Sequence, residues 1–383
     1  MFYDIIMKVL FVIPSRNGIT GASMAIINII LGIVKNAEVY VVASKPPKEY
    51  QIFLNRLEDE GAKLFLEDSS EKGLKYWKSL AKFSLNILEQ NDISIIHLHL
   101  PKLVYFLGKE IKKHNRKLVL TVEGDSLFEV EKLGLKTRLQ TKIIWNKCKK
   151  YADVMCPCSK WLAKRIQKDK KIKNVVQIYN AIDINRFLNV KINRELLDIP
   201  EDEFVVTTAA RLTRVKAIDV LLKGYSNFLK KNKEAKSRLI ILGEGELRNE
   251  LNELSRELEI DKFVHFLGFK NNPQDYIATS DVFVISSNYE PFGMPAIESG
   301  VLGIPTIVSK AGGLAEIVID EKTGYQFDIG DHVALSKNLE KLYQNPELRK
   351  KFGKNAKKYV SENFSPQKIA EQYMKIYSDL LRN

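Results

Sequence analysis

Short apolar runs rich in Val and Ile alternate with longer amphipathic stretches along the chain, and this pattern constrains the fold more than any other sequence feature. Within the runs, apolar and polar residues barely alternate, which is typical of strands covered by helices on both faces. Repeated strand–helix units indicate parallel sheets. The predicted strands are Lys8–Ile13, Val39–Ala43, Lys63–Leu66, Ser94–His99, Lys117–Val122, Asp153–Cys156 and Val175–Tyr179 in the first half, and Phe204–Ala209, Leu239–Leu242, Val264–Leu267, Val282–Ile285 and Pro305–Val308 in the second.

The length of 383 residues exceeds the roughly 250–300 residues at which a single hydrophobic core stops growing. We therefore expect two domains. A polar stretch of mixed charge around Asp183–Pro200 is the expected linker. The predicted fold class is α/β, with two Rossmann-like doubly wound domains facing a cleft. Open sheets of this kind bind ligands outside the carboxyl ends of their strands, so a site is sought in those loops.

The net charge of +13 is concentrated in the first half of the sequence. Residues 1–190 hold 32 Lys and Arg against 19 Asp and Glu, whereas residues 191–383 hold 28 of each kind. Three interpretations stay open: nucleic-acid binding, for which no recognition motif is present, an ordinary Lys-rich solvated surface, and docking on anionic lipid. Leu135–Tyr151 supports the last, because apolar residues such as Leu139 and Ile143 stand there among six basic residues.

Targeting and membrane-spanning signals are weak. No run of about 18 uncharged apolar residues is present, so we expect no membrane-spanning helix. The apolar opening Met1–Ile13 lacks a basic leader and a cleavage site of small residues, which argues against a signal peptide. We expect a cytoplasmic protein, with peripheral binding to the inner face of the cell membrane as a further hypothesis.

Two carboxylates follow the predicted strand Val282–Ile285. Glu290 stands in a loop, and Gly293 and Met294 open a helix that carries Glu298. The amino terminus of such a helix presents free N–H groups and a positive dipole, which suit a diphosphate. Carboxylates accept hydrogen bonds from hydroxyl groups, which suits sugars. The combination indicates a nucleotide-sugar site, although a solvated carboxylate pair is the commoner meaning of this spacing taken alone.

Cations and glycines follow two other predicted strands. Arg211 and Lys216 come directly after Phe204–Ala209, where they can meet phosphate groups. Gly243 and Gly245 follow the next strand and permit close approach of the backbone. The third glycine of a dinucleotide-binding fingerprint is missing, which argues against a dehydrogenase.

Taken in order, these motifs resemble the retaining GT-B glycosyltransferases of family 4, a group that includes glycogen and sucrose-phosphate synthases. The resemblance is densest over Phe204–Phe327. It is weaker through the first half, where Gly21 matches a glycine of the family's amino-terminal loop. The matching blocks are N-A-I-D, A-A-R-L-T-R-V-K, L-G-E-G, H-F-L-G-F, D-V-F-V-I-S-S-N-Y-E-P-F-G-M-P-A-I-E, and A-G-G-L-A-E-I-V with T-G-Y.

The resemblance implies an acceptor-binding domain over residues 1–185, joined by a final helix over 366–383, and a donor-binding domain over 195–365. It implies no cofactor and no metal at the chemical step. His97 and His99 end a predicted strand, but no third ligand accompanies them, so a structural or acceptor-side role is favoured over a metal site.

The resemblance also implies roles for single residues. Arg211 and Lys216 would clamp the donor diphosphate and stabilise charge on the leaving group. Glu298 would hold the ribose hydroxyls, and Glu290 would contact the transferred sugar. The implied catalytic set is Arg211, Lys216, Glu290 and Glu123. The implied donor-binding residues are Gly21, Arg211, Lys216, Gly243, Gly245, Glu290, Phe292, Gly293, Met294 and Glu298.

Several positions depart from the family pattern. Thr20, Ala181 and Ala217 stand where glycine is frequent. More consequential is Glu123, because many members have histidine there, facing the transferred sugar. In one interpretation, the Glu123 carboxylate changes the charge beside the reacting carbon. In the alternative, Glu123 only caps the following helix. Asp125 is a nearby alternative polar contact.

We therefore expect a retaining enzyme that moves a hexose-type sugar to a glycan or lipid-linked acceptor in cell-surface polysaccharide or glycolipid biosynthesis. A UDP-sugar is the expected donor and GDP-mannose the runner-up. A sugar-nucleotide hydrolase or epimerase on a related fold is a further alternative. Nucleic acid is not an expected partner, whereas an anionic membrane surface is one.

Overall fold

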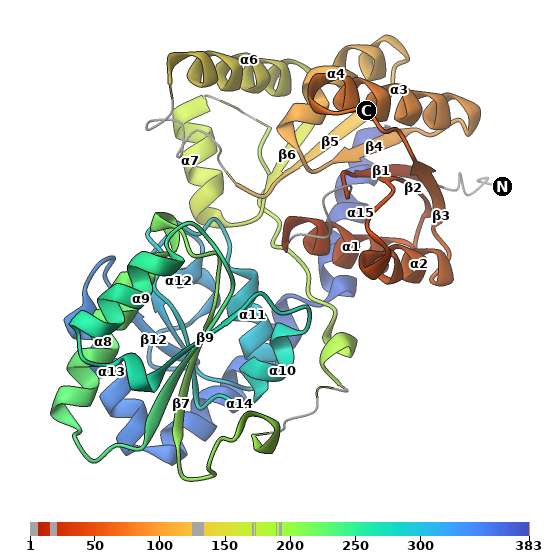
Figure 1. The fold of residues 1–383 in the computed structure, drawn as a ribbon. Helices are drawn as coiled ribbons and strands as arrows, with labels where there is room; N and C mark the ends of the chain where they lie inside the picture. The colour runs from red at the N-terminus through yellow and green to blue at the C-terminus, as the bar shows by residue number, and fades with distance from the viewer. Residues whose placement is uncertain are drawn as a thin grey trace. The chain divides into compact units, whose positions relative to one another are not determined.

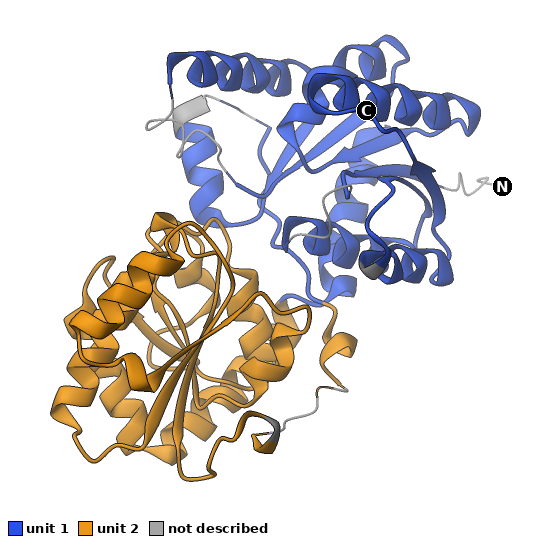
Figure 2. Cartoon of the chain, viewed as in Figure 1, with its two compact units in different colours: residues 1–182, 364–383 blue, residues 183–363 orange. Residues whose placement is uncertain are grey.

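In a computed structural model, the chain forms two compact units (Figure 2). The structure describes residues 7–15, 21–124, 134–170, 172, 174–188, 190 and 194–382. Unit 1 comprises residues 1–182 and 364–383, and unit 2 comprises residues 183–363. Each unit has a six-stranded parallel sheet with helices on both faces, so the predicted fold class of two doubly wound units is confirmed. Within the described residues, no helix is long and apolar enough to cross a membrane.

The sheet of unit 1 has the strand order β3-β2-β1-β4-β5-β6, and all its pairings are parallel. Neighbours β1 and β4 are separated in sequence by two strands, so the direction of winding reverses between them. The strands are β1 (Lys8–Ile13), β2 (Glu38–Ser44), β3 (Lys63–Glu67), β4 (Ile95–Leu98), β5 (Lys117–Val122) and β6 (Val154–Pro157).

The helices of unit 1 cover both faces of this sheet. Figure 1 shows α1, α2 and α15 on one face, and α3, α4 and α6 on the other. The helical segments are α1 (Gly21–Ile33), η1 (Lys48–Tyr50), α2 (Gln51–Asp59), α3 (Gly73–Gln90), α4 (Pro101–Lys113), α6 (Leu135–Tyr151), α7 (Lys160–Lys170) and α15 (Pro366–Arg382).

Helix α1 is buried over nearly its whole length because it packs against α15 as well as the sheet. Its sequence is apolar on all sides, as expected of a helix without a solvent face. Gly32 makes the contact with α15 possible: a Cβ atom there would lie 2.1 Å from the carbonyl oxygen of Pro366. Any larger residue at position 32 would force α15 away from α1.

Two tyrosines of α15 are hydrogen-bonded to the sheet, Tyr377 through His97 and Tyr373 through Thr121. The Tyr377 hydroxyl lies 2.6 Å from His97 Nδ1, and His97 Nε2 lies 2.7 Å from Thr121 Oγ1. Thr121 Oγ1 is in turn 2.7 Å from the Tyr373 hydroxyl. Burial lowers the pKa of His97 well below its usual value, so the imidazole is neutral at physiological pH. These contacts give His97 a structural role in holding α15.

The sheet of unit 2 has the order β12-β11-β10-β7-β8-β9, again wholly parallel. Its winding reverses between β7 and β10. The strands are β7 (Phe204–Ala209), β8 (Ser237–Leu242), β9 (Val264–Gly268), β10 (Val282–Ile285), β11 (Thr306–Ser309) and β12 (Gly324–Phe327). The helical segments are η2 (Ile184–Phe187), η3 (Glu195–Leu197), η4 (Arg214–Lys216), α8 (Ile218–Lys231), α9 (Arg248–Glu257), η5 (Asp261–Phe263), α10 (Pro273–Ala278), α11 (Met294–Val301), α12 (Leu314–Ile317), α13 (His332–Gln344) and α14 (Pro346–Asn363).

Eleven of the twelve predicted strands are observed, and their ends differ by at most two residues. The prediction of a strand over Val175–Tyr179 is wrong. That segment follows the edge of β6 but forms only a single bridge, between Val175 and Met155. Strand β12 was not predicted, because it has four residues and begins with glycine, so it lacks the Val- and Ile-rich signal of the others.

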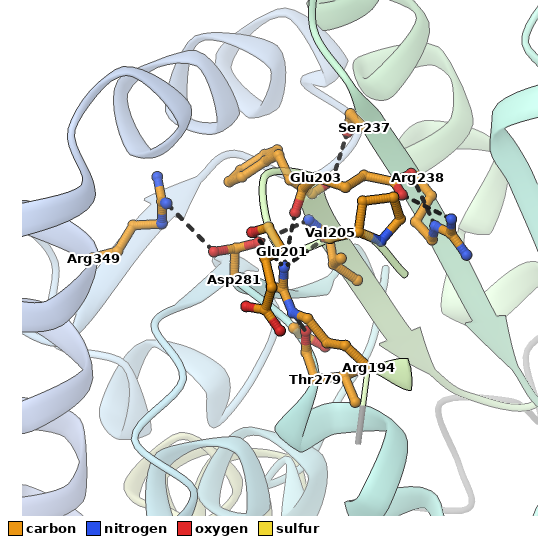
Figure 3. A network of polar contacts seen from close by, with 12 residues as sticks. Arg194, Glu201, Glu203, Val205, Ser237, Arg238, Thr279, Asp281 and Arg349 are labelled. Carbon is orange, nitrogen blue, oxygen red and sulfur yellow. Dashed lines mark hydrogen bonds and ion pairs between the residues drawn. The ribbon is translucent and has the colours of Figure 1, made fainter. Parts of the chain in front are cut away.

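A polar network lies at the amino ends of β7 and β10 in unit 2 (Figure 3). Asp281 Oδ2 accepts hydrogen bonds from Arg194 Nη2 and from the backbone N–H of Val205, each at 2.9 Å. Arg349 Nη2 lies 3.3 Å from Asp281 Oδ1, and Figure 3 shows the two arginines on either side of the carboxylate. Because parallel sheets bind ligands at the opposite edge, this network serves the structure of unit 2.

Candidate active site

The predicted donor-site residues of unit 2 that carry charge lie in the loops that follow β7 and β10 or on the helix after β10, and the predicted glycines Gly243 and Gly245 follow β8. Arg211 comes two residues after β7, and Lys216 ends η4. Glu290 lies in the loop after β10, and Glu298 lies on α11, which this loop enters. Since β7 and β10 are the neighbours between which winding reverses, these residues occupy the switch point where open α/β sheets form a binding crevice.

The two loops are joined by hydrogen bonds around Lys216. The Ser286 hydroxyl donates to the carbonyl oxygens of Lys216 and Ala217, at 3.1 and 2.8 Å. The backbone N–H of Asn288 donates to the carbonyl of Val215 at 2.8 Å. Ala217 has φ +47°, in the left-handed region, where an alanine is less favourable than glycine. The bend that directs Lys216 is therefore held by bonds from the β10 loop.

Lys216 and Glu290 form an ion pair, with 2.5 Å between Lys216 Nζ and Glu290 Oε2. Their side chains are 20% and 14% exposed, so both are largely withdrawn from water yet reachable. A lysine ammonium has three donors and an ionised carboxylate has several acceptor positions. The pair can therefore bind a phosphate oxygen through Lys216 and a sugar hydroxyl through Glu290 at the same place.

The backbone of Glu290 is held by a glycine pair that precedes α12. The N–H of Gly313 donates to the Glu290 carbonyl at 2.9 Å. Gly312 has φ +61°, and a Cβ atom there would lie 2.1 Å from the same carbonyl oxygen. Only glycine fits this position, since both the conformation and the space exclude a side chain. The sequence showed these glycines as part of a motif, but no role for them could be predicted.

Helix α11 begins at the same edge of the sheet. Its first residues are Met294 and Pro295, preceded by Gly293. Neither Gly293 nor Met294 donates a backbone hydrogen bond to any described residue, so these N–H groups can serve a ligand. The Phe292 side chain is buried, with 3% of its surface exposed. If Phe292 contributes to the site, it does so through its backbone.

Glu298 lies in the second turn of α11 and is partly exposed. Burial raises the pKa of its carboxyl, and the charge of Arg186 partly opposes this effect. A carboxylate that is costly to ionise in the ligand-free protein gains most from hydroxyl donors, which stabilise the charged form.

The glycines after β8 act on the β7 loop. A Cβ atom at Gly243 would lie 2.0 Å from the Ala210 carbonyl oxygen, and one at Gly245 would lie 2.3 Å from that of Leu212. These carbonyls flank Arg211, whose own side chain is exposed. Gly243 and Gly245 thus let the two loops touch and thereby position Arg211.

In unit 1, Glu123 follows β5 and is held by two side chains. Its Oε1 lies 3.2 Å from His99 Nδ1, and its Oε2 accepts a hydrogen bond from Asn180 Nδ2 at 2.6 Å. His99 and Asn180 are buried. Asp125 lies outside the described residues, and so does the segment after it where a helix capped by Glu123 was expected. Gly21 is the exposed first residue of α1, and the adjoining Thr20 also lies outside the described part.

Two family models together match most of the chain. The model described as Glycosyltransferase Family 4 matches residues 19–186, and the model described as Glycosyl transferases group 1 matches residues 189–359. The chain belongs to glycosyltransferase family 4. The predicted family and the predicted enzyme class are therefore confirmed.

Named relatives agree with this assignment. This family 4 glycosyltransferase is 26% identical over 315 residues to the N-acetyl-alpha-D-glucosaminyl L-malate synthase of Bacillus anthracis, covering 80% of each chain. It is 30% identical over 213 residues to the O-antigen biosynthesis glycosyltransferase WclY of Escherichia coli, covering 55% of this chain and 56% of WclY. The crystal structure of HepE from Anabaena in complex with UDP-glucose aligns with a TM-score of 0.79 at 21% identity, over 97% of this chain and 100% of HepE. The likeness establishes the GT-B fold.

Replacing Glu298 with glutamine in this glycosyltransferase should raise the melting temperature of the ligand-free protein at neutral pH. The folded-state pKa of Glu298 is raised, so the folded protein loses stability relative to the unfolded chain as pH rises from the usual glutamate range through that raised pKa. Glutamine has no charge to bury. The melting-temperature difference between variant and wild type should therefore vanish in acid and grow over this window.

The measurement is a series of thermal melts from acid to neutral pH. The matched control is Glu250→Gln, at an exposed position on α9, which should show no such window. A difference between Glu298→Gln and wild type that does not change with pH would contradict the assigned effect of burial.

Proposed function

We propose that the enzyme transfers a hexose-type sugar from a nucleotide-sugar donor to a glycan or lipid-linked acceptor, with retention of the anomeric configuration. The proposed setting is the biosynthesis of a cell-surface polysaccharide or glycolipid. The observation that carries the proposal is the Lys216–Glu290 pair at the switch point of unit 2, 2.5 Å apart. It offers a cation to a diphosphate and a carboxylate to a sugar beside the amino terminus of α11.

In the proposed reaction, Arg211 and Lys216 stabilise the negative charge that develops on the departing diphosphate. The bond between the anomeric carbon and the diphosphate oxygen breaks while the acceptor oxygen bonds to that carbon from the same side. The leaving phosphate takes the acceptor proton. Glu290 contacts the transferred sugar and Glu298 the ribose hydroxyls, and no metal or cofactor takes part.

A UDP-sugar is the proposed donor. HepE, which shares the fold, is described in complexes with UDP and with UDP-glucose, and this supports UDP over the alternative, GDP-mannose. The name of WclY refers to O-antigen biosynthesis, which supports a glycan acceptor. The name of the B. anthracis relative refers to L-malate, so a hydroxy acid belongs among the acceptors to be tested.

We place acceptor recognition in unit 1, with Glu123 as a polar contact. Its two carboxylate oxygens are already engaged by His99 and Asn180, which fixes the carboxylate and leaves its remaining lone pairs for hydroxyl donors. The proposed location is the cytoplasm, at the inner face of the cell membrane, where lipid-linked acceptors are presented.

The first test is a thermal-shift panel of UDP, GDP, ADP, CMP and their common sugar conjugates on wild type and Glu298→Ala. A ligand that binds only the folded state raises stability, by about 2.7 kcal/mol at a hundredfold excess over Kd. We expect UDP and one of its sugar conjugates to raise the melting temperature of the wild type, and to raise that of the variant less. A shift in melting temperature with GDP alone would identify a GDP-sugar as the donor in place of a UDP-sugar. No shift with any nucleotide would overturn the proposed donor site.

Product analysis then separates transferase from hydrolase or epimerase. With the selected donor, transfer requires a glycosylated product that appears only when a glycan, lipid-linked or hydroxy-acid acceptor is added. Proton NMR of that product gives the anomeric configuration. Release of free sugar at the same rate with and without acceptor would favour a hydrolase.

A further inference from the structure

Helix α6 in unit 1 has one face that packs and one that does not. Its buried residues are Thr141, Trp145, Cys148 and Tyr151, and the helix packs against α4. On a helix of 3.6 residues per turn these four share one side. The opposite side is therefore the solvent side of unit 1.

Three large aliphatic residues lie along that solvent side. Leu135, Leu139 and Ile143 are 84%, 60% and 42% exposed, and their spacing of four residues aligns them in one row. We call this row the α6 stripe. The stripe faces away from the core, so packing among the described residues of unit 1 does not account for it.

Cations flank the α6 stripe on both sides. Helix α6 has no acidic residue, and among the described residues none of its cations forms an ion pair. Lys136 lies on one side of the stripe, and Arg138 and Lys142 lie on the other; all three are exposed. The full set, called the α6 cations, is Lys136, Arg138, Lys142, Lys147, Lys149 and Lys150.

The combination selects one kind of partner. A Lys-rich solvated surface explains the α6 cations but not three exposed aliphatic side chains in a row. Nucleic acid would use the cations but offers no apolar surface to the stripe. A second copy of the chain would bring like charges together around the stripe, which is unfavourable. An anionic lipid surface satisfies both features, because head groups attract the cations and the acyl boundary accepts the aliphatic residues.

We propose that the solvent face of α6 docks unit 1 on an anionic lipid surface, with the α6 stripe inserted at the boundary between head groups and acyl chains. This deepens the membrane association within the proposed function by naming its surface. It depends on the geometry of unit 1 and not on the donor chemistry of unit 2.

The test is flotation with vesicles of phosphatidylcholine mixed with phosphatidylglycerol, and with vesicles of phosphatidylcholine alone. We expect the wild type to float with the mixed vesicles at low salt and much less with the neutral ones. Each cation near an anionic surface strengthens binding about fivefold, so binding should fall as salt rises. Failure to float with the mixed vesicles at low salt would overturn the proposal.

Two triple variants, one of the α6 stripe and one of its flanking cations, separate the apolar contribution to membrane binding from the electrostatic one. The stripe variant should lose most of its flotation at every salt concentration, and the cation variant should bind mixed vesicles at least about tenfold more weakly. Because every substituted residue is exposed, the fold should be kept. The stripe variant is Leu135→Ser, Leu139→Ser and Ile143→Ser; the cation variant is Lys136→Gln, Arg138→Gln and Lys142→Gln.

Matched controls change the same number of aliphatic or basic residues at exposed positions elsewhere and should float like the wild type. Equal losses in the controls would overturn the assignment to α6. Light scattering tests whether a second copy of the chain binds the stripe instead. A wild-type dimer that becomes a monomer in the stripe variant would identify the stripe as a dimer interface and overturn the proposal. If flotation fails, the thermal shift with nucleotide should still be seen. The flotation result therefore tests the membrane surface independently of the donor site. The aliphatic control is Ile52→Ser, Ile329→Ser and Val333→Ser; the charge control is Lys351→Gln, Lys354→Gln and Lys357→Gln.

Discussion

Replacing Lys216 with alanine is expected to lower kcat/KM for sugar transfer by about 10²- to 10³-fold, the usual loss when one group that stabilises developing negative charge is removed. Lys216 is the cation that lies in contact with Glu290 at the switch point. Its ammonium would meet the diphosphate, where charge accumulates as the bond to the sugar breaks. The loss should appear in both kcat and the affinity for the free nucleoside diphosphate.

Glu290→Gln should behave differently, although it removes the other half of the same ion pair. If Glu290 contacts the transferred sugar, the variant should bind the free diphosphate about as well as wild type while transfer falls by a similar factor. Isothermal titration with the diphosphate and steady-state kinetics with the full donor separate the two roles.

Lys236→Ala is the control for these two variants, since Lys236 is an exposed lysine paired with Asp202 on the same unit. It should change neither binding nor turnover. Equal loss of diphosphate affinity in Lys216→Ala and Glu290→Gln would mean that the pair acts only by holding its two loops together.

The donor half of the site could be predicted from sequence because its residues occur in short, ordered blocks after strands with a strong signal. Arg211 and Lys216 follow one buried apolar run and Glu290 follows another, and parallel pairing of β7 with β10 then brings them to one edge. Their direct contact could not be predicted. It depends on the bend at Ala217 and on bonds from Ser286, neither of which has a local sequence signature.

The surroundings of Glu123 show the limit of sequence reasoning more sharply. Its partners His99 and Asn180 are 24 and 57 positions away in sequence and come from different loops. The unusual residue at position 123 was visible, but the side chains that hold it were not. A buried polar contact between distant segments is a property of the packed sheet.

The largest loss of stability is expected from Asp281→Ala. One carboxylate there serves two guanidinium groups and a backbone N–H: Arg194, Arg349 and Val205. The two arginine side chains are 15% and 20% exposed, so removal of the carboxylate leaves their charges poorly compensated. Arg194 also donates to the carbonyls of Thr279 and Glu203, which ties the segment before β7 to the start of β10 (Figure 3).

Hydrogen bonds to charged groups contribute about 1.5–3 kcal/mol each, and losing one partner of a buried pair costs about 3–5 kcal/mol. With allowance for partial exposure, we expect Asp281→Ala to lose about 2–4 kcal/mol. For a unit of this size that corresponds to a melting temperature about 5–12 °C lower. The chain has two units, so the unfolding transition to compare is the one whose melting temperature rises when nucleotide is added.

Calorimetry with and without nucleotide identifies that transition. Asp281→Ala should lower it and leave the other unchanged, while kcat at a temperature well below it stays close to wild type, because the network lies at the opposite edge of the sheet from Lys216. Asp281→Asn retains one acceptor and should lose less than half as much. Asp202→Ala removes an exposed partner of Lys236 and should lose little; a loss as large as that of Asp281→Ala would show that burial of the network does not govern the stability of unit 2.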